Sequence, residues 1–151
     1  AEYNYRLSEE KRLVSLMPFE HPVKVVEGEY LPKDYFEYVK GLENEPEGGK
    51  RCEKCFRLRL ESSACYAKEH GFDYFTTTLT ISPLKNAQKL NEIGSQLAEE
   101  YHVACLPSDF KKKGGYLRSI ELSRQYDLYR QDYCGCVFSK RERDKRIVQE
   151  S

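Results

Sequence analysis

Six cysteines are the residues of this 151-residue chain best suited to chemistry, and four of them form two close pairs. Cys52 and Cys55 are separated by two residues, while Cys134 and Cys136 enclose a single glycine. Close pairs that lie far apart in a sequence are more typical of metal ligands than of a disulfide scaffold. Four thiolates suit either zinc or an iron–sulfur cluster, and the number of cysteines does not choose between them.

The first pair follows two glycines and opens a predicted helix at about residue 51. Side chains three positions apart lie on nearly one face of a helix. The helix N-terminus and the neighbouring cations favour thiolate, which is the form of cysteine that binds metal. We therefore expect Cys52 and Cys55 to be metal ligands or a redox dithiol, and the alternative is a pair of buried thiols near a helix start.

The second pair, Cys134 and Cys136, encloses Gly135, which lets the backbone bend around a shared metal. Its alternative is a pair of packed thiols in a turn. Cys65 and Cys105 differ, because one lies inside a predicted helix and the other in an apolar predicted strand. We expect both to be small packing residues of the core.

Two polar segments follow predicted strands. Residues 76–86 combine hydroxyls, Lys85 and the start of the next helix, which suits phosphate or sugar oxygens. Residues 109–119 combine three lysines, two glycines and aromatic side chains, which suits an RNA backbone with stacked bases. The alternatives are ordinary strand threonines with a helix cap, and a solvated charged loop. Asp109 is also a candidate oxygen ligand or proton carrier.

The elements that must position these residues alternate between helix and strand. Hydrophobic periodicity and helix-stop signals predict helices over 3–17, from Pro32 to about 42, over 51–70, 86–101 and 116–126, and a last helix capped by Ser139. Strands are predicted at 23–26, 72–78 and 102–106. This order predicts one α/β domain over 1–151, with a parallel sheet and helices on both faces. Three strands are few for such a sheet, so we expect its first strands to precede residue 1.

Ligands of open α/β sheets bind beyond the carboxyl ends of the strands. The loops at 79–85 and 107–115 are therefore the expected place for function, together with the cysteine pairs. The formal net charge is zero, but residues 107–151 carry 11 Lys and Arg against 7 Asp and Glu. This third is the expected face for a polyanion. No apolar run approaches the roughly 20 residues that span a bilayer, and no signal peptide is visible, so we expect a cytoplasmic protein.

Four segments together resemble epoxyqueuosine reductases of the QueH type, from about residue 2 to residue 146. They are GLENEPEGGKRCEKCFRLRL (41–60), DYFTTTLTISPLKN (73–86), DFKKKGGYLRSIELS (109–123) and YRQDYCGCVFS (129–139). The resemblance implies a Rossmann-like domain with a 4Fe–4S cluster, an additional iron ion and no cobalamin. It also implies reduction of epoxyqueuosine to queuosine at the wobble position, in the anticodon loop of tRNA, with electrons from a donor that the sequence does not identify.

The resemblance also assigns residues. Cys52, Cys55, Cys134 and Cys136 match the family's metal ligands, and which of them hold the cluster or the additional iron stays open. The family carries an adjacent Cys-Cys pair near its N-terminus that this chain lacks, so we expect an N-terminal segment to be missing and the metal site to be incomplete.

In the implied reaction an open iron position acts as a Lewis acid on the epoxide, the cluster supplies electrons, and an acid protonates the leaving oxygen. Asp109, Lys111 and Tyr116 are candidates for that acid by residue type. Two other functions compete with the reductase. One is a non-catalytic RNA module with a four-cysteine zinc site, and the other is a thiol oxidoreductase that uses Cys52 and Cys55.

Overall fold

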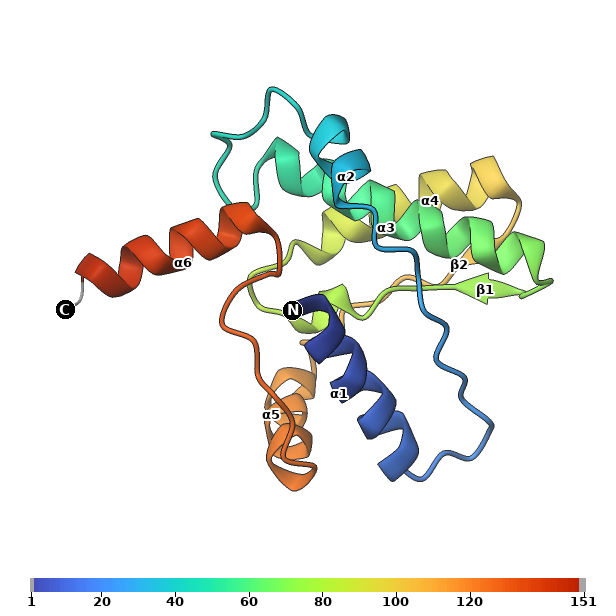
Figure 1. Cartoon of the computed structure of the whole chain (residues 1–151). Coiled ribbons are helices and arrows are strands. Elements are labelled where there is room, and N and C mark those ends of the chain that lie inside the picture. The colour runs from blue at the N-terminus through green and yellow to red at the C-terminus, as the bar shows by residue number, and fades with distance from the viewer. Residues whose placement is uncertain (1, 150–151) are drawn as a thin grey trace. The chain divides into compact units, whose positions relative to one another are not determined.

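The computed structural model describes residues 2–149, which form six α-helices, one 3-10 helix and two short strands (Figure 1). The elements are α1 (Glu2–Leu16), α2 (Pro32–Tyr38), α3 (Lys50–Glu69), β1 (Tyr74–Phe75), η1 (Leu79–Ile81), α4 (Ala87–Tyr101), β2 (Ala104–Cys105), α5 (Gly115–Gln125) and α6 (Val137–Gln149). The chain divides into two compact units. We call residues 32–119 the central unit, and the described residues of 1–31 and 120–151 the terminal unit.

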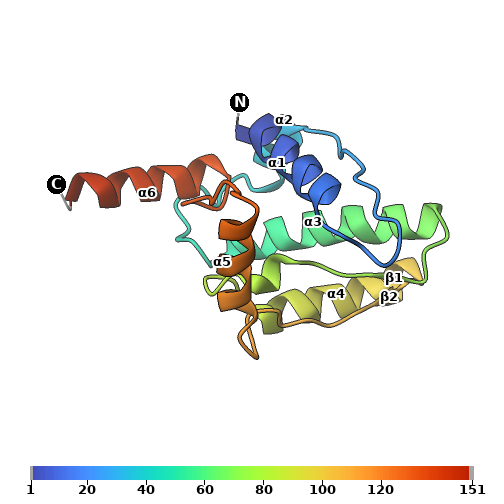
Figure 2. The ribbon, with the colours of Figure 1, turned by 90° about the horizontal axis from the view of Figure 1, so that it is seen from below.

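The central unit contains a two-stranded parallel sheet, in which Tyr74 pairs with Ala104 and Phe75 with Cys105. Figures 1 and 2 show α3 and α4 side by side on one side of this strand pair, and both helices contact the strands. Parallel strands require a crossover connection, and α4 supplies it between β1 and β2. The carboxyl ends of both strands therefore lie at the same edge of the sheet.

The core of the central unit lies between the two helices and the strands. Residues spaced by one helical turn on α3 and α4 point into it, as their sequence periodicity predicts. Its buried members are Phe56, Leu60, Ala64, Ala67, Phe75, Leu90, Ile93, Leu97 and Val103. Cys52 and Cys105 pack against this cluster from its margin. The CxxC motif is thus anchored to the core through the first turn of α3.

In the terminal unit, polar contacts join α1 to the loop that precedes α6. The Arg12 guanidinium donates to the carbonyl oxygens of Tyr126 at 2.9 Å and Asp127 at 2.8 Å. The Tyr129 N–H donates to the Glu9 carboxylate at 2.8 Å, and the Tyr129 ring packs edge-on against that of Tyr5. Side chains of α1 therefore hold the backbone of a segment more than 100 residues later in the sequence.

The α/β class is confirmed as helices with a parallel strand pair, and the helices predicted at 3–17, 51–70, 86–101 and 116–126 are confirmed. The helix from Pro32 ends earlier than predicted, at Tyr38. The strands predicted at 72–78 and 102–106 are confirmed in place but are shorter. The strand predicted at 23–26 is wrong, because this segment is a loop in which Val23 and Val26 are each 48% exposed. The single domain and the helices on both sheet faces stay predictions. No helix of the described residues is long and apolar enough to cross a membrane.

Candidate functional site

The CxxC turn (residues 48–55) lies at the N-terminus of α3. Gly49 is the residue before the helix, and Gly48 has a φ of +89°, a conformation that favours glycine. This shape directs the Gly48 N–H at the Cys52 sulfur, to which it donates at 3.2 Å. Cys55 lies one helical turn further on, and both cysteines are half-buried and outside any disulfide. The sequence therefore places two cysteine sulfurs at a helix start, as predicted.

Arg51 fixes the loop that leads into the CxxC turn. Its side chain is almost fully buried, with 1% of the residue exposed. One guanidinium nitrogen, Nη1, donates to the carbonyl oxygens of Leu42 at 3.3 Å and Glu43 at 3.1 Å, and also to that of Glu45. Hydrogen bonds from a charged donor are stronger than neutral ones. The turn is thus braced by the residue directly before its first cysteine.

The CxC turn (residues 133–139) leads into α6. Gly135 has a φ of +114°, which only glycine adopts readily, so the backbone bends there as the sequence predicts. Cys136 directly precedes the helix, and the Ser139 N–H donates to its sulfur at 3.4 Å. Ser139 does not cap α6 as predicted. It lies in the first turn of that helix, 2% exposed, and its hydroxyl accepts the Cys134 N–H at 3.0 Å.

Arg6 of α1 holds the backbone of the CxC turn. Its Nη1 donates to the Cys134 carbonyl oxygen and its Nη2 to the Tyr133 carbonyl oxygen, each at 3.2 Å. Its Nε pairs with Glu2 at 2.7 Å, and the guanidinium carbon lies 5.0 Å from the centroid of the Tyr133 ring. Arg143 of α6 lies at the same distance from that ring. The sequence carries no local signal for Arg6, because its partners are 127 and 128 residues away.

Both turns therefore share one feature, a cysteine sulfur at a helix start that accepts a backbone N–H. Hydrogen bonds to sulfur tune thiolate-bound clusters. Cysteine sulfurs of this kind are a donor set that fits iron or zinc. Within residues 2–149 no three His, Cys, Asp or Glu side chains gather closely enough to hold a metal ion. The two turns belong to different units.

Cys65 and Cys105 have other surroundings. Cys105 packs against the core, and burial raises the pKa of its thiol. A Cβ atom on Gly94 would lie 2.5 Å from the Cys105 sulfur, so this close approach requires glycine. Cys65 lies outside the core cluster, and its thiol donates to the Glu69 carboxylate at 3.3 Å, which raises the pKa of Cys65. The packing prediction is confirmed for Cys105 and is wrong for Cys65, which does not pack against the core cluster.

The two loops beyond the strands hold each other through hydroxyl groups. Thr80 is fully buried, and its Oγ1 lies 2.9 Å from the Ser108 Oγ and accepts the Phe110 N–H at 3.3 Å. Thr76 donates to the carbonyl oxygen of Leu106 at 2.8 Å. The hydroxyls that suggested a site for phosphate or sugar thus join segment 76–86 to segment 106–110.

Of the three candidate acids, two lie in direct contact. The Asp109 carboxylate receives the Lys111 ammonium at 3.1 Å and the Lys112 ammonium at 3.3 Å. These hydrogen bonds hold the pKa of Asp109 below its ordinary value of 3.8. Asp109 is therefore an anion near neutral pH. Tyr116 lies in the first turn of α5, half-buried.

A series of polar contacts connects Asp109 with the CxxC turn inside the central unit. Lys111 Nζ donates to the carbonyl oxygen of Lys85 at 3.3 Å. Lys85, only 8% exposed, pairs through its own Nζ with Glu47 at 3.0 Å. Glu47 directly precedes Gly48, whose N–H meets the Cys52 sulfur. The loop that carries the candidate acids is thus tied to the turn that carries the first cysteine pair.

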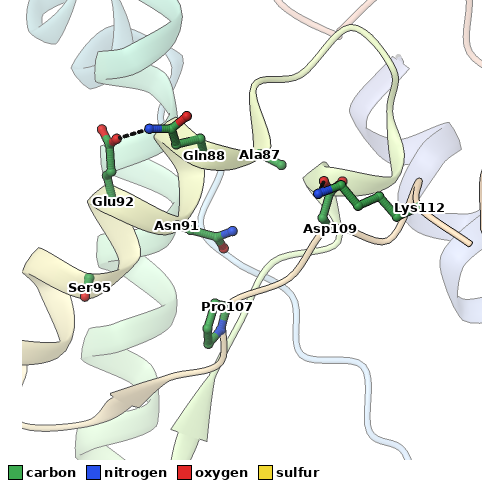
Figure 3. A pocket seen from close by; sticks show the side chains of 8 residues that line it. All are labelled: Ala87, Gln88, Asn91, Glu92, Ser95, Pro107, Asp109 and Lys112. Carbon is green, nitrogen blue, oxygen red and sulfur yellow. Dashed lines mark hydrogen bonds and ion pairs between the residues drawn. The ribbon is translucent and has the colours of Figure 1, made fainter.

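An open pocket of about 600 Å³ lies beside these loops, where the carboxyl end of β2 was predicted to carry function (Figure 3). Figure 3 shows Asp109 and Lys112 next to each other at one end of the pocket, with Gln88 and Glu92 of α4 at the other. Asn91 lies between them, and its amide is fixed by two hydrogen bonds to the Ser108 backbone, at 2.9 and 3.0 Å.

Comparisons with known proteins bear on these residues. The sequence profile of the family described as epoxyqueuosine reductase QueH matches residues 1–142. The chain belongs to this family. A relative from Streptococcus pyogenes serotype M1, named epoxyqueuosine reductase QueH, is 50% identical over 127 residues, which are 84% of this chain and 50% of the relative. A relative of the same name from Staphylococcus epidermidis is 53% identical over 119 residues, or 78% of this chain and 50% of the relative.

A more distant QueH relative from Dehalococcoides mccartyi is 37% identical over 142 residues, which are 94% of this chain and 72% of that relative. The family resemblance inferred from the four sequence segments is thereby confirmed. The chain spans about half the length of the first two relatives. Both cysteine turns lie within the residues that the family profile matches.

Proposed function

We propose that this chain carries out epoxyqueuosine reduction, the reductive deoxygenation of epoxyqueuosine to queuosine at the tRNA wobble position. One observation carries the proposal. In a chain of the QueH family, two cysteine pairs lie at helix starts, and in each pair one sulfur accepts a backbone N–H. The reaction consumes two electrons and two protons, releases the epoxide oxygen as water and leaves a cyclopentene.

In this proposal Cys52, Cys55, Cys134 and Cys136 are metal ligands. When bound, a 4Fe–4S cluster and an additional iron ion supply the electron transfer and the Lewis acidity that loss of the epoxide oxygen requires. The chain's own part is to present thiolates and to keep their geometry. The N–H donors of Gly48 and Ser139 orient one sulfur of each pair, as groups around a metal site commonly do.

Lys111 is our candidate for the group that gives a proton to the leaving oxygen. Its ammonium is held by Asp109 at 3.1 Å and by the Lys85 carbonyl oxygen at 3.3 Å. Asp109 is then a positioning anion, because its lowered pKa leaves it without a proton to donate near neutral pH. Tyr116 remains a second candidate donor by residue type. A positioned general acid contributes about 10²- to 10⁴-fold in rate.

The partner in this proposal is a tRNA whose anticodon loop carries epoxyqueuosine, which places the reaction in the cytoplasm. The excess of Lys and Arg in residues 107–151 supports attraction of the RNA backbone. The electron donor stays open. We also propose that the parallel strand pair belongs to a Rossmann-like sheet with helices on both faces, because the family resemblance implies it and the crossover through α4 fits it.

The test is single-turnover reduction of epoxyqueuosine-containing tRNA by the full chain. The chain is reconstituted anaerobically with iron and sulfide, dithionite supplies electrons, and nucleosides from digested tRNA are analysed by mass spectrometry. We expect conversion to queuosine, its loss in Cys134→Ser, and a decrease of about 100-fold or more in Lys111→Met. Lys68→Met is the control, because Lys68 lies exposed in the last turn of α3, outside the segments assigned to RNA, and it should retain the rate.

Two results would contradict the proposal. An iron-loaded chain that leaves epoxyqueuosine unchanged in the presence of dithionite lacks the activity. A chain that instead holds one zinc ion tightly and only binds tRNA is the non-catalytic module that the cysteine pattern also allows.

A further inference from the structure

The CxC turn carries one of the two cysteine pairs, and its shape is held both by the neighbouring Ser139 hydroxyl and by a side chain of α1. The backbone carbonyl groups at positions 133 and 134 accept hydrogen bonds from the Arg6 guanidinium of α1. A guanidinium presents its donors in a fixed planar fork. Nη2 donates to the Tyr133 carbonyl, and Nη1 donates both to the Cys134 carbonyl and to the Gln131 side chain. Glu2 holds the Arg6 Nε at 2.7 Å, so all three nitrogens of the guanidinium have a partner.

The turn is fitted closely to this guanidinium. A Cβ atom at Gly135 would lie 2.9 Å from Arg6 Nη1, which is too close for an ordinary contact. The Tyr133 ring lies 5.0 Å from the same guanidinium, within the range of cation–π attraction. Arg6 thus contacts the residue before the first cysteine, the first cysteine itself and the glycine between the two cysteines.

We propose that Arg6 is a positioning residue for metal binding by Cys134 and Cys136. It fixes the carbonyls of Tyr133 and Cys134, and thereby the bend that sets the direction of both sulfurs. This inference rests on the proposed role of the pair as metal ligands. It assigns a function to the first helix, which carries no cysteine and none of the candidate acids.

A matched control lies on the same helix. Arg12 also donates to two backbone carbonyls of the loop, those of Tyr126 and Asp127, at 2.9 and 2.8 Å. It differs from Arg6 in that its partners lie well before the cysteines. If Arg6 only docks α1 onto the loop, then replacing either arginine should have the same effect. If Arg6 shapes the metal-binding turn, then only its replacement should weaken metal binding.

The experiment is a titration of the metal-free full chain with Co²⁺, followed by its thiolate-to-cobalt absorption. Melting curves and far-ultraviolet circular dichroism of each variant check folding at the assay temperature. We expect Arg6→Gln to weaken cobalt affinity by about 10- to 100-fold, as loss of a residue that orients metal ligands typically does. Arg6→Lys, which keeps the charge but not the fork, should lie between Arg6→Gln and the wild type. Arg12→Gln should lower the melting temperature and leave the cobalt affinity unchanged.

The variant Cys134→Ser/Cys136→Ser separates the proposed ligand role of the cysteine pair from the proposed positioning role of Arg6. Cobalt binding that this double variant leaves unchanged would show that the pair is not a ligand pair, and the proposed metal role would fail. If the double variant loses cobalt but Arg6→Gln binds it like the wild type, only the role of Arg6 is overturned. Equal weakening by Arg6→Gln and Arg12→Gln would reduce Arg6 to a docking contact and would also overturn it.

Discussion

In both the CxxC turn and the CxC turn, an arginine guanidinium donates to backbone carbonyls beside the cysteine pair. The two arginines differ in how far they lie in the sequence from the carbonyls that they hold. Arg51 reaches carbonyls no more than nine residues away, and it is buried in the central unit. Arg6 reaches the Cys134 carbonyl across 128 residues, and 23% of its side chain is exposed.

This difference shows that the CxxC turn is held by contacts that are local in the sequence, whereas the CxC turn also depends on a contact that is distant in the sequence. Contacts over a short loop need little chain entropy to close, so the CxxC turn forms together with α3. The CxC turn has a local contact through Ser139, but its carbonyl groups at positions 133 and 134 gain a charged donor only when α1 meets this distant loop. We therefore expect the CxxC turn to be the more stable of the two, and the CxC turn to respond to changes far away in the sequence.

The largest expected effect comes from removing the local brace. Arg51→Gln should lower the free energy of unfolding by about 3 kcal/mol, because three backbone carbonyl groups lose a buried charged donor. Urea denaturation followed by circular dichroism measures this loss. Arg57→Gln on the same helix removes only the partly exposed ion pair with Glu100 and should cost less than about 1 kcal/mol. Equal losses for both variants would show that Arg51 is not a brace.

The core beneath the CxxC turn gives the next largest effect. Gly94→Ala would place a methyl group 2.5 Å from the Cys105 sulfur, so we expect a loss of about 2 kcal/mol from overpacking. In a Cys105→Ala background the clash is relieved, and Gly94→Ala should then be tolerated. A double-mutant cycle of urea midpoints measures this coupling. Additive effects would contradict the contact between Gly94 and Cys105.

A smaller effect is expected within the CxC turn. Ser139→Ala removes the hydroxyl that accepts the Cys134 N–H at 3.0 Å, which should cost about 1 kcal/mol. Ser63→Ala is the control, because the exposed Ser63 hydroxyl bonds only to the carbonyl one turn earlier on α3. Thermal unfolding of both variants tests the prediction. A Ser139→Ala variant as stable as the control would show that the hydroxyl does not hold the turn.

The smallest expected effect is a pH dependence confined to the terminal unit. Hydrogen bonds from Arg12 and the Tyr129 N–H lower the pKa of Glu9 from 4.5 to about 2. Since the folded pKa is the lower one, this stabilisation is complete above about pH 4.5 and is lost as the pH falls toward 2. Glu9→Gln should flatten that part of the profile of melting temperature against pH. Glu10→Gln, exposed on the same helix, should leave it unchanged.

The same contrast explains what the sequence alone could predict. Periodicity located α3 and α4, and the spacing of Cys52 and Cys55 located the CxxC turn, because these signals act over a few residues. Val23 to Val26 misled the prediction, since β-branched residues form a strand only where a partner strand covers them. Arg6 could not be predicted from local pattern, because its partners are set by tertiary packing. Ser139 was correctly predicted to lie at the start of the last helix. Its hydroxyl, however, accepts an N–H from the CxC turn and does not cap the helix.

The most direct test of the central claim, that both cysteine pairs bind metal, is the iron and acid-labile sulfide content after anaerobic reconstitution. The full chain is compared with Cys52→Ser/Cys55→Ser, Cys134→Ser/Cys136→Ser and the control Cys65→Ser. The account predicts that iron and sulfide bind to the wild type and to the control, and that either double variant loses most of both. Iron content that stays unchanged when either pair is replaced would contradict it.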